Sequence, residues 1–119
     1  MIKIKNFTED EFECKCGCGL NNMDSHFLIR LEKTRIIADI PFILTSACRC
    51  KQHNKNEGGE DDSEHLTGEA VDVETTTSRD RDIIVDAAKA AGITRRGIGK
   101  SFTHLGEGKN KVKKVMWVY

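Results

Sequence analysis

Two histidines and one aspartate are the side chains in this sequence best suited to bind a metal ion. His65 and Asp72 lie in the segment SEHLTGEAVD, residues 63–72, and His104 lies nearer the end of the chain. Two imidazoles and one carboxylate, with a fourth position left to water, form the ligand set of a catalytic zinc site. By itself this spacing favours hydrogen-bonded His–Asp pairs, which are common, so metal binding starts as one hypothesis of two.

A tight turn and two strands would bring these three side chains together. Gly68 favours a turn directly after the first histidine. The alternating pattern over residues 70–74 predicts a half-buried strand that carries the aspartate. Residues 98–105 form another predicted strand, which carries the second histidine. We therefore expect one imidazole and the carboxylate to meet across a short stretch of backbone.

The remaining elements predict an α+β domain with a mostly antiparallel sheet and two main helices packed against it. Their order is helix, strand, loop, strand, helix, strand, strand. The expected elements are an irregular segment 6–22 anchored by Phe7 and Phe12, a helix from Asp24 or Ser25 to about Ala38, a strand Phe42–Ser46, a surface loop 51–63, a helix capped by Ser78 and ended before Gly92, and a final strand Val112–Tyr119.

Composition limits the classes of function. The 119 residues, 38% of them hydrophobic, suit one domain spanning 1–119. The 19 basic and 19 acidic side chains balance, so neither nucleic acid nor membrane is expected as a partner, and we expect a monomer. No apolar run follows the start of the chain, so no signal peptide is visible and synthesis in a cytoplasm is expected. Release to a cell wall by a phage or holin route is left open.

Five cysteines are many for this length, and they fall in two groups. Cys14, Cys16 and Cys18 alternate near the start, whereas Cys48 and Cys50 flank Arg49. Reduced thiols packed as small apolar groups are the favoured interpretation. One or two disulfides are the second, although an odd number cannot pair completely within one chain. A structural zinc site is the third, because Cys-x-Cys is tighter than the usual thiolate spacing.

The pattern Ser-x-His-x-x-Gly-x-Ala-x-Asp, complete in residues 63–72, resembles the zinc D-Ala-D-Ala carboxypeptidase family. That family includes phage and bacterial cell-wall endopeptidases, and its fold is shared with the amino-terminal signalling domain of hedgehog proteins. The segments TSACRC (45–50), GIG (97–99) with FTH (102–104), and VMWVY (115–119) are similar to further family segments in the same order.

The resemblance implies a role for each matched residue. His65, Asp72 and His104 would bind one catalytic zinc ion. Arg49 would meet a carboxylate or carbonyl of the substrate, a task that suits a forked guanidinium. The alternative is that Arg49 pairs with one of the loop acids Asp61, Asp62 or Glu64. Ser63 would bind the ligand loop or the substrate, and His53 would support the loop or contact the substrate.

The general base is the weakest part of the implied site. Many relatives have an acid three residues before the last ligand, where this chain has Ser101. Others have one two residues after it, where this chain has Gly106. Glu107 comes next and is the favoured candidate for the base, and Glu69 and Glu74 are two further candidates.

The resemblance implies a zinc metallopeptidase that hydrolyses peptidoglycan stem peptides, either as a carboxypeptidase or as an endolysin-like endopeptidase. The missing family acid leaves a second hypothesis, a non-catalytic zinc-containing binding module of the same fold. A purely structural zinc protein is disfavoured, because structural zinc usually has four protein ligands.

Overall fold

The computed structural model describes residues 4–119, which form an α+β fold around one five-stranded sheet. The strand order is β1-β2-β4-β3-β5, and every pairing is antiparallel except the parallel pair β3–β5. The helices are α1 (Glu9–Phe12), α2 (Ser25–Ala38), α3 (Lys51–Asn56) and α4 (Ser78–Ala90), and the strands are β1 (Leu44–Ser46), β2 (Ala70–Glu74), β3 (Arg95–Ile98), β4 (Phe102–Gly106) and β5 (Val115–Val118).

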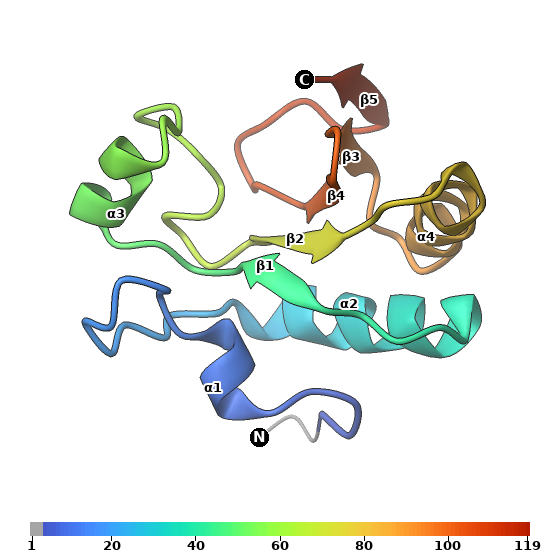
Figure 1. The fold of residues 1–119 in the computed structure, drawn as a ribbon, viewed down its shortest axis with the longest axis horizontal. Coiled ribbons are helices and arrows are strands. Elements are labelled where there is room, and N and C mark those ends of the chain that lie inside the picture. The colour runs from blue at the N-terminus through green and yellow to red at the C-terminus, as the bar shows by residue number, and fades with distance from the viewer. Residues whose placement is uncertain (1–3) are drawn as a thin grey trace.

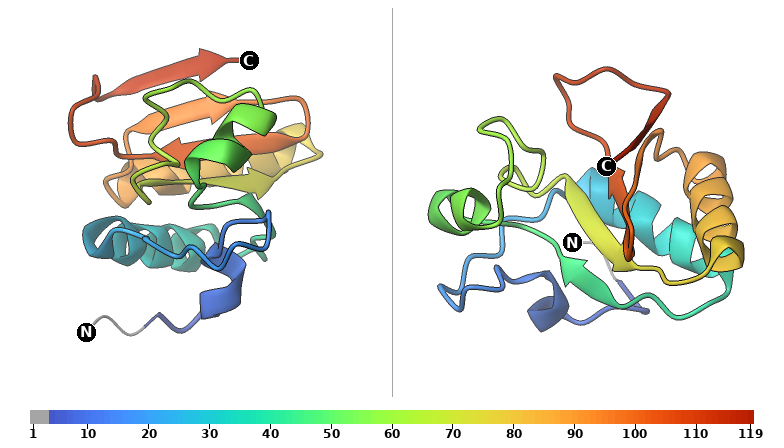
Figure 2. Two further views of the ribbon diagram at one scale, coloured as in Figure 1. Left: turned by 90° about the vertical axis from the view of Figure 1, so that its left-hand side faces the viewer. Right: turned by 45° about the horizontal axis from the view of Figure 1, so that its top comes forward.

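Helices α2 and α4 pack against each other and cover one face of the sheet (Figures 1 and 2). Phe27 and Leu31 of α2 meet Ile84 of α4 in a core that also includes Val71 and Leu105 from the central strands. Side chains alternate between the two faces of a strand. The apolar residues of β2 and β4 therefore point to the helices, and their alternate residues, Asp72 and His104, point to the open face.

The predicted ends of the two main helices are nearly correct. Asp24 caps α2 by accepting a hydrogen bond from the backbone N–H of Phe27 at 3.0 Å. Thr77, one residue before the expected cap, does the same for α4 by accepting from Asp80 at 3.1 Å. Gly92, just past α4, has a φ of 94°, which suits glycine. In the described residues, no helix is both long and apolar enough to cross a bilayer.

Three predicted segments differ from the structure. Residues 6–22 were expected to be irregular, but they contain the helix α1. Residues 51–63 were expected to be a loop throughout, but Cys50 caps the helix α3 at their start. The strand expected over 98–105 is a hairpin instead: β3 ends at Ile98, and the backbone N–H of Gly99 donates to the carbonyl of Phe102 at 2.9 Å. This turn sends the chain back, so that β4 lies between β2 and β3.

The N-terminal segment packs beneath the sheet through its predicted anchors. Phe7 and Phe12 are both buried, and their ring centroids lie 5.5 Å apart. The buried carboxylate of Glu32 on α2 accepts hydrogen bonds from the backbone N–H groups of Lys5 and Asn6 at 2.9 and 3.2 Å. The segment is therefore fixed to α2 before the chain reaches the cysteine-rich loop.

A candidate metal centre on the open face of the sheet

One row of residues runs across all five strands and forms the floor of the candidate site. Ser46 pairs with Asp72, Asp72 with His104, His104 with Gly97, and Gly97 with Trp117. Directly paired residues project from the same face of a sheet. A Cβ atom at Gly97 would overlap the indole of Trp117, so glycine lets this ring lie over the sheet, with its centroid 5.4 Å from that of His104.

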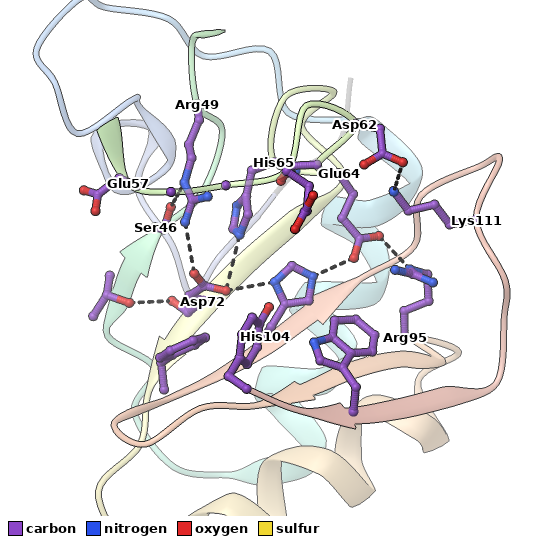
Figure 3. A pocket seen from close by; sticks show the side chains of 18 residues that line it. Ser46, Arg49, Glu57, Asp62, Glu64, His65, Asp72, Arg95, His104 and Lys111 are labelled. Atoms are coloured by element: carbon purple, nitrogen blue, oxygen red, sulfur yellow. Dashed lines mark hydrogen bonds and ion pairs between the residues drawn. The ribbon is translucent and has the colours of Figure 1, made fainter. Parts of the chain in front are cut away.

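The three predicted metal ligands meet on this row. One ligand atom from each of His65, Asp72 and His104 lies within 4.8 Å of the other two. Oδ1 of Asp72 lies 3.3 Å from Nε2 of His65 and 2.9 Å from Nδ1 of His104. All three side chains are buried, and Figure 3 shows them converging. The β2–β4 pairing thus brings together side chains far apart in the sequence.

In each histidine, the ring nitrogen that lies farther from Asp72 forms a hydrogen bond that fixes the orientation of the ring. Nδ1 of His65 lies 2.6 Å from the carbonyl oxygen of Ala47. A carbonyl can only accept, so Nδ1 carries a proton and Nε2 is the nitrogen that faces Asp72 and is placed to bind a metal ion. Metal-binding histidines are commonly oriented by this kind of bond.

Glu64 performs the same task for His104, a role that the sequence motifs did not indicate. Its Oε2 lies 2.6 Å from Nε2 of His104, and its Oε1 accepts from Nε of Arg95 at 3.0 Å (Figure 3). The same Oε1 accepts from the backbone N–H of Gly108 at 2.7 Å. A Cβ atom at Gly106 would overlap this carboxylate. The sequence signal that could have indicated this role is a glutamate directly before the ligand histidine His65, together with Gly106 and Gly108, which leave room for its carboxylate.

The charges of these groups are strongly coupled. Burial acts to raise the pKa of Glu64, but His104, the backbone N–H of Gly108 and Arg95 outweigh it and lower that pKa to about 2. The pKa of Asp72 is likewise lowered, because both histidines outweigh its burial. Burial acts to lower the pKa of His104, and the two carboxylates raise it. A histidine nitrogen must be deprotonated to bind a metal ion, so the affinity of this centre for a metal ion falls as the pH falls.

Arg49 lies beside the three potential ligands. Its Nη2 is 3.4 Å from Oδ2 of Asp72, and its Nε donates to the hydroxyl of Ser46 at 2.9 Å (Figure 3). Its Nη1 donates to the side chain of Asn54 at 3.2 Å. The loop acids proposed from the sequence as its partners, Asp61, Asp62 and Glu64, are not among these contacts. The guanidinium therefore lines the same cavity as the metal ligands.

Ser63 and Gly68 shape the loop that carries His65. The hydroxyl of Ser63 accepts from the backbone N–H of His65 at 3.2 Å. Gly68 has a φ of 70°, and a Cβ atom there would overlap the backbone of Asn22. His53 lies on α3, where its Nε2 is 3.5 Å from Glu57, and it is not among the residues that line the cavity.

The structure does not bring Glu107 to the metal ligands. Its carboxylate forms an ion pair with Arg30 of α2 at 2.6 Å, and it is not among the lining residues. Its backbone N–H donates to the carbonyl of Glu69 at 2.9 Å, so the β2–β4 pairing directs position 107 away from the site. Glu69 and Glu74, the two further candidates for the base, also lie elsewhere. Glu69 is buried and accepts from Thr67, and Glu74 is exposed at the end of β2.

The centre opens into a cavity of about 780 Å³, a size typical of ligand-binding sites. The cavity is lined by most of the polar segment 57–64 and by three aromatic side chains, Phe102, Trp117 and Tyr119. Two imidazoles with fixed tautomers and one carboxylate suit zinc, and such a set beside an open cavity is typical of catalytic rather than structural metal centres.

Comparison with known families agrees with this class of site. The sequence model of the family described as Peptidase M15 matches residues 5–106, which is most of the chain. The chain therefore belongs to the peptidase M15 family, and the metallopeptidase class predicted from its motifs is supported at that level. No curated protein matched the chain.

Proposed function

We propose that this protein is a zinc-dependent peptidase that hydrolyses peptide bonds in the stem peptides of peptidoglycan. The observation that carries the proposal is the convergence of His65, Asp72 and His104 on the floor of a cavity that also contains Arg49. Zinc held by these three residues would polarise the scissile carbonyl and activate water for attack. Membership of the peptidase M15 family supports the same reaction class.

The residues around the three metal ligands would bind the substrate or orient the ligands. Arg49 is placed to bind a carboxylate or carbonyl of the peptide, since its guanidinium lines the cavity. Glu64 and the carbonyl of Ala47 hold the two imidazoles in the required tautomers. The indole of Trp117 packs beside His104 and closes one side of the floor. Together these groups would orient the substrate and the metal ligands.

A non-catalytic binding module is the second candidate, and one observation favours it. Ser101 and Gly106 occupy the two positions where relatives carry an acid, and Glu107 is paired with Arg30. General acid–base catalysis typically contributes about a hundredfold to ten-thousandfold to a rate. A centre without a proton acceptor would therefore bind stem peptides and cleave them slowly.

A digest of purified peptidoglycan decides between the two candidates. Zinc-loaded wild-type protein is incubated with walls of several peptide chemistries, and new peptide termini are identified by mass spectrometry. His104→Gln, which retains a hydrogen-bonding side chain beside Glu64, is the matched control. New termini in the wild type alone support a peptidase, and their position distinguishes carboxypeptidase from endopeptidase. Binding without new termini in any wall supports the binding module.

A further inference from the structure

Four of the five cysteines gather at a second place in the molecule, outside the histidine–aspartate centre. Cys14, Cys16 and Cys18 come from the loop after α1, and Cys50 comes from the start of α3. The four Sγ atoms all lie within 4.8 Å of one another. Figure 1 shows this loop, in blue, beneath the segment that enters α3. Two parts of the chain that are distant in sequence thus contribute to one cluster of thiols.

The separations of the sulfur atoms match those of thiolates around a metal ion. Sγ of Cys16 lies 3.5 Å from that of Cys14 and 3.7 Å from that of Cys50. Zinc–sulfur bonds of about 2.3 Å in a tetrahedron place the sulfur atoms about 3.8 Å apart. All five cysteines lie in the described part of the chain, and none is in a disulfide. Exposure of Cys16 and Cys18 also shows that apolar packing, the interpretation favoured from the sequence, does not describe them.

The local backbone explains how so tight a spacing can serve one site. The chain turns over residues 15–18, where the backbone N–H of Gly17 donates to the carbonyl of Cys14 at 3.2 Å. Gly17 has a φ of 86°, a conformation that favours glycine. This turn folds the alternate cysteines back toward one point, which an extended Cys-x-Cys-x-Cys segment would not do.

Backbone donors already point at two of the sulfur atoms. The N–H of Cys50 donates to Sγ of Cys14 at 3.4 Å, and the N–H of His53 donates to Sγ of Cys50 at 3.3 Å. Hydrogen bonds of this kind favour the charged form of an acceptor, which for cysteine is the metal-binding thiolate. The first turn of α3 therefore supports the cluster in the way that outer hydrogen bonds support metal ligands.

Cys48 accounts for the odd number of cysteines. Its side chain is fully buried, and its thiol donates to the carbonyl oxygens of Phe12 at 2.9 Å and Leu20 at 3.2 Å. This cysteine has the buried, reduced character expected from the sequence. The five cysteines therefore divide into a cluster of four and a single packing residue.

We propose that Cys14, Cys16, Cys18 and Cys50 bind a structural zinc ion. Four thiolates complete a tetrahedron and leave no position for substrate, which distinguishes this site from the histidine–aspartate centre. The ion ties the loop after α1 to the residue next to Arg49, and so fixes the backbone that carries this guanidinium into the cavity. The proposal is independent of peptidase activity, because it concerns a different set of ligands.

Metal analysis of protein purified under reducing conditions tests the proposal. The wild type is expected to contain two zinc equivalents, the double variant C16S/C18S one, and His104→Gln one. Cys48→Ala, which removes the packing thiol, is the matched control and keeps two. Cobalt substitution adds a second measurement: thiolate-to-cobalt charge-transfer absorption should appear in the wild type and in His104→Gln and be absent from C16S/C18S.

Two results would overturn the cysteine site without affecting the histidine–aspartate centre. One is a single zinc equivalent in the wild type that C16S/C18S retains and His104→Gln loses. The other is a peptide map of unreduced wild type that links Cys50 to Cys14 or Cys16 as a disulfide. Loss of peptidoglycan cleavage alone would bear on the proposed peptidase and not on this site.

Discussion

The histidine–aspartate centre takes Asp72 and His104 from adjacent strands, whereas the cysteine cluster takes its side chains from a loop and from the first turn of a six-residue helix. His65, Asp72 and His104 are all buried, while two of the four clustered cysteines are exposed. The sheet holds its ligands in place through backbone pairing. The loop is held by fewer backbone hydrogen bonds, from Cys14 to Leu20 and from Gly17 to Cys14.

The difference between the two regions reflects what each metal ion would have to do. A catalytic centre must hold its ligands at fixed positions while substrates come and go, and strands provide that rigidity. A structural ion contributes its binding free energy to folding, so its ligands need not be fixed in advance. Metal-dependent order should therefore differ sharply between the two regions.

Metal removal should give the largest effect. After chelation, backbone amides of residues 14–20 are expected to exchange with solvent at least about a hundredfold faster, because the loop loses the ion that orders it. Amides of β2 and β4 should change little, because their hydrogen bonds lie within the sheet. Hydrogen-exchange mass spectrometry measures both in one experiment. If the amides of residues 14–20 and those of β2 and β4 lost exchange protection equally, the loop would depend on metal no more than the sheet does.

Glu64→Gln should lower the zinc affinity of the histidine–aspartate centre about tenfold to a hundredfold, because outer hydrogen-bond partners commonly contribute that much. Competition with a chelator of known affinity gives the measurement. Asp62→Asn is the matched control: Asp62 also lines the cavity, but its carboxylate is exposed and pairs with Lys111. Equal affinities in the two variants would show that Glu64 does not support His104. Zinc at the cysteines should be unchanged in both.

Arg49→Ala should lower kcat/KM for stem peptides about tenfold to a hundredfold while zinc content stays the same. A hydrogen bond to a charged group contributes roughly 1.5–3 kcal/mol, which corresponds to that range of rates. Arg30→Ala, which removes a half-exposed arginine paired with Glu107, is the control and should be nearly neutral. A large loss of thermal stability with unchanged specific activity would instead make Arg49 a structural residue.

Glu107→Gln should have the smallest effect, with activity and zinc content within about twofold of wild type. Its partner Arg30 is 48% exposed, and ion pairs of this kind contribute about 0–1 kcal/mol. If Glu107 were the general base, the same change would lower the rate about a hundredfold or more. Peptidoglycan digestion rates of the two proteins separate these outcomes and test the assignment made from the sequence.

Much of the fold could be predicted because its signals are local. Val71 and Val73 alternate with Asp72, and this pattern defines β2 with the bounds that the structure shows. Helix α3 and strand β3 were missed, and they have no such signal. Helix α3 is polar, with only Asn54 buried, and its start depends on the sulfur of Cys50. Strand β3 begins Arg95-Arg96-Gly97, and it is a strand because β4 and β5 pair with it.

The sequence motifs name candidate residues of the site, but not the contacts between them. His65, Asp72 and His104 could be named, but the support of His104 by Glu64 depends on a contact between a loop and β4. Arg49 could be named as well, while its contact with Asp72 depends on the β1–β2 pairing. The position of Glu107 could not be predicted, because nothing near it in the sequence shows Arg30 as its partner.

The close packing of Glu64 against Gly106 makes these two positions structurally interdependent. Any side chain at position 106 would occupy the space of the Glu64 carboxylate, which His104, Arg95 and the backbone of Gly108 hold in place. An acid introduced at position 106 would therefore displace Glu64 from these partners, and His104 would lose the hydrogen bond that orients it. Moving an acid to position 106 thus requires a change at position 64 as well.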